Sequence, residues 1–216
     1  MEEPRGARLH KRGLPREGVM RRTLLVLCAF AVVVFTANGC GGQTDKAASG
    51  ASSGDRAAVV KYSSDVAPGF KVYIDMTLTN KKAQQALKVA KDRNRFLDEF
   101  DRFVVEIRLA AKKLGAVTPP ASLSTAHASW IDGLNQMSIS ADRFRDAYKK
   151  YVRTPAPTAA TKAKIRKLWN KFADDGIVQA QAMGTWITTL GQEADAMNIP
   201  EAQWLKDGVS RMQQSL

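Results

Sequence analysis

The sequence predicts an all-α protein, an up-and-down antiparallel helical bundle of three long helices followed by a short C-terminal helix. Apolar side chains recur at alternating steps of four and three residues over long segments, which places them on one face of an α-helix. Proline-containing turns at 118–120 and 154–158 separate these segments. Because long helices joined by short turns lie antiparallel to their neighbours, an up-and-down bundle follows.

The first long helix is expected to extend from the region of Val66 to Gly115, where glycine ends it. Residues 70–79 allow two interpretations, because apolar and polar side chains alternate there as in a β-strand. No second convincing strand follows, and a lone strand cannot satisfy its backbone hydrogen bonds. We therefore favour a helix, with Asp65 as a candidate cap before Pro68. The expected buried stripe is Phe96, Phe100, Phe103, Val104, Ile107, Ala110, Ala111 and Leu114.

The second and third long helices are expected at about 121–152 and about 159–197, and a short last helix is expected to begin at Pro200. Three glycines of the third helix, Gly191 among them, predict close approach to a neighbouring backbone or a bend. The stripe of the second helix is Leu123, His127, Trp130, Leu134, Met137, Ala141, Phe144, Tyr148 and Tyr151. The stripe of the third is Ile165, Trp169, Phe172, Gly176, Ala180, Met183, Ile187, Leu190, Ala194 and Met197.

The segment 20–40 has the features of a secretory signal peptide. Two arginines precede an unbroken apolar run at 24–35, and small residues lead from this run to Cys40. As a helix the run spans about 18 Å, which is too short for a hydrocarbon core of about 30 Å. This favours a cleaved peptide over a transmembrane helix. Because Met20 opens a complete signal peptide, translation starts either there or at Met1.

The residues Ala37-Asn38-Gly39-Cys40 resemble the lipobox of bacterial lipoproteins, matching it at the last two positions and departing from it at the first two. In that family the signal peptide is cut just before the cysteine, and the cysteine sulfur carries diacylglycerol. Here the leader and signal peptide together are residues 1–39. The resemblance implies that Cys40 is lipidated and that acyl chains such as palmitate anchor the protein on the extracytoplasmic face of the cell membrane. An ordinary cleaved secretory peptide and an uncleaved anchor are the alternatives.

The predicted mature chain divides into a tether and one domain. Residues 40–55 hold the lipidated cysteine and a Gly/Ser/Ala-rich segment that is typical of a flexible linker. Residues 56–216 suit one helical bundle domain. This domain contains no cysteine, so its stability comes from packing rather than from disulfides.

Charge gives the first indication of a partner. Residues 40–216 hold 26 basic and 18 acidic side chains, an excess of eight positive charges. This excess favours acidic partners, either anionic lipid or a wall polymer, in addition to the membrane lipid that an acylated cysteine enters. A soluble surface of mixed charge is the other interpretation. We expect no nucleic-acid partner, because no dense basic block with interleaved aromatic residues is present.

We predict no enzymatic activity, no cofactor and no metal site. The mature chain offers one histidine and no cysteine other than Cys40, and the predicted domain, residues 56–216, lacks Gly-x-Ser-x-Gly, Ser-x-x-Lys and phosphate-binding glycine motifs. Zinc needs several His or Cys ligands, and a di-iron bundle needs Glu-x-x-His pairs. Acidic pairs such as Asp174 and Asp175 lie off the apolar stripes, where we expect them to be solvated.

His127 is the polar residue that stands out, because it lies within an apolar stripe and needs a partner there. One interpretation is a hydrogen bond across the core that fixes the helix register. The other is a candidate pocket lined by His127, Met183 and Trp186, with the small Ala110 at the same level. The leading expectation is a non-enzymatic binding or scaffolding module of unknown partner. The alternative is a ligand-binding or sensor domain with a pocket between helices near His127 and Trp186.

The chain as a whole resembles small helical lipoproteins of high-GC Gram-positive bacteria. The likeness lies in the lipobox, in the linker, in the sequence Thr-Pro-Pro at 118–120 followed by His127, and in the late Asn-Ile-Pro at 198–200. Most members of that group lack a known activity. The resemblance therefore implies a location and a helical fold, and it carries over no catalytic residue.

Overall fold

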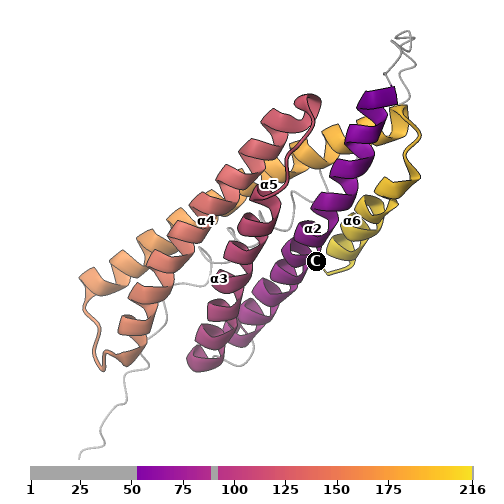
Figure 1. The fold of residues 1–216 in the computed structure, drawn as a ribbon. Coiled ribbons are helices and arrows are strands. Elements are labelled where there is room, and N and C mark those ends of the chain that lie inside the picture. Colours follow the sequence, from indigo (N-terminus) through magenta and orange to yellow (C-terminus); the bar gives the residue numbers. More distant parts are fainter. Residues whose placement is uncertain (1–52, 89–91, 216) are drawn as a thin grey trace, which may run out of the picture.

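The computed structural model describes residues 53–88 and 92–215. Within these ranges the chain forms five α-helices and one short 3₁₀ turn, with no strand. The all-α prediction is therefore confirmed (Figure 1). The elements are α2 (Ser53–Lys88), α3 (Arg93–Gly115), α4 (Ala121–Arg153), α5 (Ala159–Ala196), η2 (Pro200–Ala202) and α6 (Gln203–Ser215).

Four long helices make an elongated antiparallel bundle in which α2 packs on α3, α3 on α4 and α4 on α5 (Figure 1). The short helix α6 runs back along α2. The start of α2 and the end of α5 lie at one end of the bundle, and the turn between α4 and α5 lies at the other. The prediction of three long helices is wrong, because the first of them is two helices, α2 and α3.

The chain reverses direction before Asp92, which caps the start of α3. The Asp92 side chain accepts hydrogen bonds from the backbone N–H groups of Asn94 and Arg95, each at 3.0 Å. The Asp92 N–H donates back to the carbonyl of Ala86, near the end of α2, at 3.2 Å. Residues 86–95 contain neither proline nor glycine, the usual sequence signals of a turn, so the break was not predicted.

Helix α2 includes residues 70–79, so the helical interpretation of that stretch is confirmed and the strand interpretation is wrong. The helix begins at Ser53, well before the predicted start, and takes in the last three residues of the predicted linker. Pro68 lies inside this helix. Asp65 is therefore not a cap, and its carboxylate pairs instead with Lys61 one turn earlier.

The predicted apolar stripes form the core of the bundle. Every stripe position predicted for α3 is buried, and in α4 only Tyr151 is half-buried. The stripe of α5 is buried except at three half-buried positions, which are Ile165, Ala180 and Met197.

Aromatic side chains fill this core in two clusters. The first centres on Trp130 of α4 and Trp186 of α5, which stack with ring centroids 4.4 Å apart. Phe70 of α2 contacts both rings, with centroid distances of 6.0 and 5.6 Å. The second cluster joins α3, α4 and α5 through Phe96, Phe100, Phe103, Phe144, Tyr148, Trp169 and Phe172.

Two glycines allow neighbouring helices to approach closely. A Cβ atom on Gly133 of α4 would lie 2.9 Å from the Cα of Gln179 in α5. A Cβ atom on Gly69 of α2 would lie 2.7 Å from Cδ2 of Leu114 in α3. The close approach predicted for the glycines of α5 does not hold at Gly191, where a Cβ atom would have nothing within 4 Å.

The turn after α5 gives the Asn-Ile-Pro sequence its structural role. Asn198 adopts the left-handed conformation, with φ of 50°, and the N–H of Ile199 donates to the carbonyl of Ala194 at 2.8 Å. This is a common way to satisfy the last carbonyls of a helix. Pro200 then begins η2, and α6 follows at Gln203 instead of at the proline itself.

Candidate functional site

His127 lies buried in the core, with 5% of its surface exposed. Its Nδ1 atom lies 2.7 Å from the hydroxyl oxygen of Tyr62 in α2. The same hydroxyl accepts a hydrogen bond of 2.6 Å from Nε1–H of Trp186 in α5. His127, Tyr62 and Trp186 therefore form one hydrogen-bonded chain across three helices, which we name the core triad.

The donors and acceptors of the core triad follow from the chemistry of its groups. The Trp186 indole can only donate, so the Tyr62 hydroxyl accepts from it, and the proton of that hydroxyl is free to be donated to Nδ1 of a neutral His127. A backbone hydrogen bond with Leu114, at the end of α3, also acts on the imidazole. His127 therefore has a partner in α3 as well as in α2 and, through Tyr62, in α5.

Burial sets the protonation of the triad. It lowers the pKa of His127 below its ordinary value, and the hydrogen bond to Leu114 only partly opposes this shift. Burial likewise raises the pKa of the Tyr62 hydroxyl, although the bond from Trp186 acts in the opposite direction. Both groups are neutral at neutral pH. Since a general base needs its substrate within hydrogen-bond reach, a buried imidazole that is already hydrogen-bonded to Tyr62 suits a structural role.

The three residues of the predicted pocket all lie in the packed core. His127 and Trp186 are brought together through Tyr62, a residue that the sequence reasoning did not single out. Met183 is 9% exposed and lies one turn before Trp186 in α5. Ala110 is fully buried, as expected for a small residue facing the core. The geometry agrees with the structural interpretation of His127, a hydrogen bond across the core.

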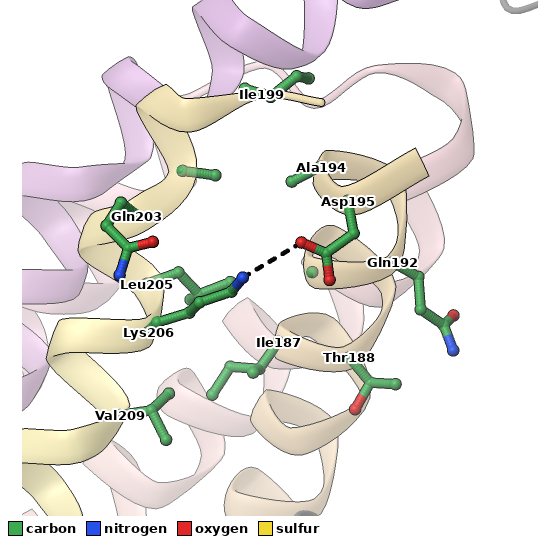
Figure 2. Close-up of a pocket in the computed structure, with 12 residues that line it drawn as sticks. Ile187, Thr188, Gln192, Ala194, Asp195, Ile199, Gln203, Leu205, Lys206 and Val209 are labelled. Atoms are coloured by element: carbon green, nitrogen blue, oxygen red, sulfur yellow. Dashed lines mark hydrogen bonds and ion pairs between the residues drawn. The ribbon is translucent and has the colours of Figure 1, made fainter. Parts of the chain in front are cut away.

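A hollow of about 170 Å³ lies elsewhere, between the last turns of α5 and the short helix α6 (Figure 2). Lys206 of α6 and Asp195 of α5 form an ion pair of 3.2 Å across it, and both side chains are largely exposed. None of the three predicted pocket residues lines this hollow. Its volume is below the roughly 300–1,000 Å³ of typical small-molecule sites.

Acidic and histidine side chains do not converge as a metal site would require. In the parts of the chain that the structure describes, no group of three or more His, Cys, Asp or Glu residues could hold a metal ion. The expectation of a solvated acidic pair at 174–175 is only half right. Asp174 is exposed, whereas Asp175 is buried and pairs with Lys171 one turn earlier.

Positive charge gathers at the end of the bundle far from the start of α2. Between 147 and 173 the chain has eight basic residues and no acidic one. Six of the eight are exposed and have no carboxylate oxygen within 4.0 Å among the described residues. These six, which we name the basic tip, are Lys150, Arg153, Lys162, Lys164, Arg166 and Lys167.

The segment 147–173 accounts for the whole positive excess of the predicted mature chain. Outside it, residues 40–216 hold 18 basic and 18 acidic side chains. Several of those other basic side chains are paired with a carboxylate on the same or a neighbouring helix. Examples are Lys61 with Asp65, Lys71 with Asp75, Arg108 with Asp142 and Lys206 with Asp195.

Favourable interaction with a helix dipole explains the presence of only some of the basic side chains in the tip. Lys150 and Arg153 lie in the last turn of α4, where positive charge is favourable toward the helix dipole. Lys162 and Lys164 lie in the first two turns of α5, where the dipole disfavours positive charge. No acidic residue in the first turn of α5 offsets them. These two lysines therefore have no evident stabilising role in the helix.

The basic tip was missed in the sequence because a turn divides it. Its two parts lie on either side of residues 154–158, and the antiparallel packing of α4 and α5 brings them to one end of the bundle (Figure 1). A search for dense basic blocks does not find such a pattern. The signal that does find it is the long run without a single carboxylate.

Comparison with known proteins assigns this chain to no family. No protein-family model matches the chain, and no curated protein or solved structure matches it either. Within the described residues, no helix is long and apolar enough to cross a membrane. The predicted signal peptide, Cys40 and most of the linker lie outside the described residues.

Proposed function

We propose that this protein is a membrane-anchored lipoprotein of the extracytoplasmic face, whose helical bundle is a non-enzymatic binding or scaffolding module. Acylation of Cys40 holds the chain in the cell membrane. The bundle extends from the anchor and presents the basic tip to a partner.

The observation that carries this proposal is the segregation of charge along the bundle. A helix of 36 residues such as α2 is about 54 Å long. The chain enters the bundle at the start of α2, and the basic tip lies at the opposite end. A surface that served solubility alone would have basic and acidic side chains interspersed.

The alternative, a ligand-binding or sensor domain with its pocket near His127 and Trp186, has less support. A polar atom of each side chain is hydrogen-bonded to the Tyr62 hydroxyl, and the Trp186 ring stacks against Trp130. The hollow beside α6 is small, and an exposed ion pair spans it.

The anchor is tested by replacing the two cysteines one at a time. Wild type, Cys40→Ala and Cys28→Ala are expressed in a bacterium that processes lipoproteins, then fractionated and weighed intact. We expect wild type and Cys28→Ala in the membrane fraction with acyl mass, because Cys28 lies in the removed peptide. We expect Cys40→Ala to lack the acyl mass. Release of the wild type into the medium without acyl mass would refute the anchor.

A further inference from the structure

We infer that the basic tip is a docking surface for a free linear polyanion, a polymer that carries phosphate groups at close intervals. This deepens the proposed function and rests on it for the position of the anchor. The six side chains of the tip are exposed and unpaired, while the mature chain outside residues 147–173 has equal numbers of basic and acidic side chains.

The spacing of the tip on α5 suits several contacts at once. Lys162 and Arg166 are four residues apart, and Lys164 and Lys167 are three apart, so each pair lies on neighbouring turns of the helix surface. From Lys162 to Lys167 the helix rises about 7 Å. Consecutive phosphates of a polymer can therefore contact more than one of these side chains.

A polymer fits this surface better than a single phosphate. Individual ion pairs between exposed groups contribute little, because water and salt screen them. A polyanion that contacts several cations together releases many bound counterions, and its affinity becomes strong and dependent on salt. The tip has six exposed cations on two packed helices, which is the arrangement that such multiple contacts require.

The position of the tip favours a free polymer over lipid headgroups. If the anchor precedes α2, the tip is separated from it by the length of the bundle, about 54 Å. Contact of the tip with the same membrane would require the bundle to lie flat along it. Along the helices between the two ends, Lys61, Lys71 and Arg108 are paired with carboxylates, so they attract anionic headgroups less than the unpaired side chains of the tip do.

The test uses the protein in the form that a lipoprotein-processing bacterium makes, purified in neutral detergent. Binding of fluorescently labelled long-chain polyphosphate is followed by anisotropy. The tip variant carries Lys162→Gln, Lys164→Gln, Arg166→Gln and Lys167→Gln. The control variant removes the same charge elsewhere, through Lys61→Gln, Lys71→Gln, Lys112→Gln and Lys113→Gln.

We expect the tip variant to bind polyphosphate about ten-fold or more weakly than wild type, and the control variant to differ by about two-fold at most. Inorganic monophosphate at equal phosphate content should not compete. The tip variant should unfold at the wild-type temperature or above it, because it removes unfavourable charge near the start of α5. If it does not fold, the pair Lys162→Gln and Lys164→Gln replaces it, with Lys112→Gln and Lys113→Gln as control.

Three results would overturn the inference. The first is an equal loss of affinity in the control variant, which would show that only net charge matters. The second is the absence of polyphosphate binding by the wild type. The third is binding of the unacylated Cys40→Ala form to neutral vesicles doped with phosphatidylglycerol but not to polyphosphate, which would assign the tip to lipid. Acyl mass on Cys40 is measured separately, so failure of the anchor and failure of the docking surface are distinguishable.

Discussion

The hydroxyl of Tyr62 in α2 lies 2.7 Å from Nδ1 of His127 in α4, and the two residues are buried together. The same hydroxyl is the acceptor for the indole of Trp186 in α5. One oxygen atom therefore satisfies two buried polar groups from two other helices. A buried donor or acceptor without a partner is costly, so this atom is a specific point of vulnerability in the bundle.

Replacing Tyr62 by phenylalanine should lower the free energy of unfolding by about 1–3 kcal/mol, because it leaves Nδ1 of His127 and Nε1–H of Trp186 unpaired. Urea unfolding measures the change. The matched control is Tyr151→Phe, since Tyr151 is half-buried and its hydroxyl has no hydrogen bond within the described structure. The control should change stability by about 0.5 kcal/mol or less. Equal losses in both variants would contradict a special role for the Tyr62 hydroxyl.

The protonation of His127 should make stability depend on pH. Burial lowers its pKa in the folded state, so between that value and the ordinary value near 6.5 the unfolded chain binds more protons. Stability should therefore fall as pH drops below about 6.5 and level off, for this group, below the folded pKa. The loss should disappear in His127→Gln, which cannot titrate. Unfolding free energies of both proteins at about pH 8 and about pH 5 test this. The same pH dependence in both would refute it.

The sequence predicted the buried faces well because burial of a helix face is a local pattern. The stripe from Phe96 to Leu114 and the stripe from Leu123 to Tyr148 need only the helical period to be recognised, and all of their positions are buried. The helical state of residues 70–79 also followed from a local argument, the lack of a partner strand. His127 was recognised as a polar residue that needed a partner in the core.

Features that depend on which helices meet could not be predicted. The partner of His127 is Tyr62, which lies 65 residues away, and nothing in the local sequence links the two. The start of α3 is capped by Asp92 and has neither proline nor glycine near it, so the sequence predicts one helix where the structure has two. The basic tip exists only because α4 and α5 pack antiparallel and bring together charges on either side of a turn.

The cap of α3 predicts a measurable loss. Asp92→Ala removes the acceptor for the N–H groups of Asn94 and Arg95 and should cost about 0.5–2 kcal/mol of stability. Asp98→Ala is the control, because Asp98 is exposed on the same helix and forms no ion pair among the described residues. Chemical unfolding of the two variants should separate them clearly. If Asp98→Ala costs as much as Asp92→Ala, lost negative charge rather than capping explains the effect.

Two glycine-to-alanine substitutions should have effects of opposite sign. In Gly133→Ala the new methyl group would lie 2.9 Å from the Cα of Gln179, a backbone atom that can move only with α5. We expect a loss of about 1–3 kcal/mol, as for other overpacked cores. In Gly191→Ala the methyl group meets nothing within 4 Å, and the higher helix propensity of alanine should add about 0.5–1 kcal/mol. Thermal unfolding of both variants decides the matter, since a stabilised Gly133→Ala would show that α4 and α5 do not approach this closely in solution.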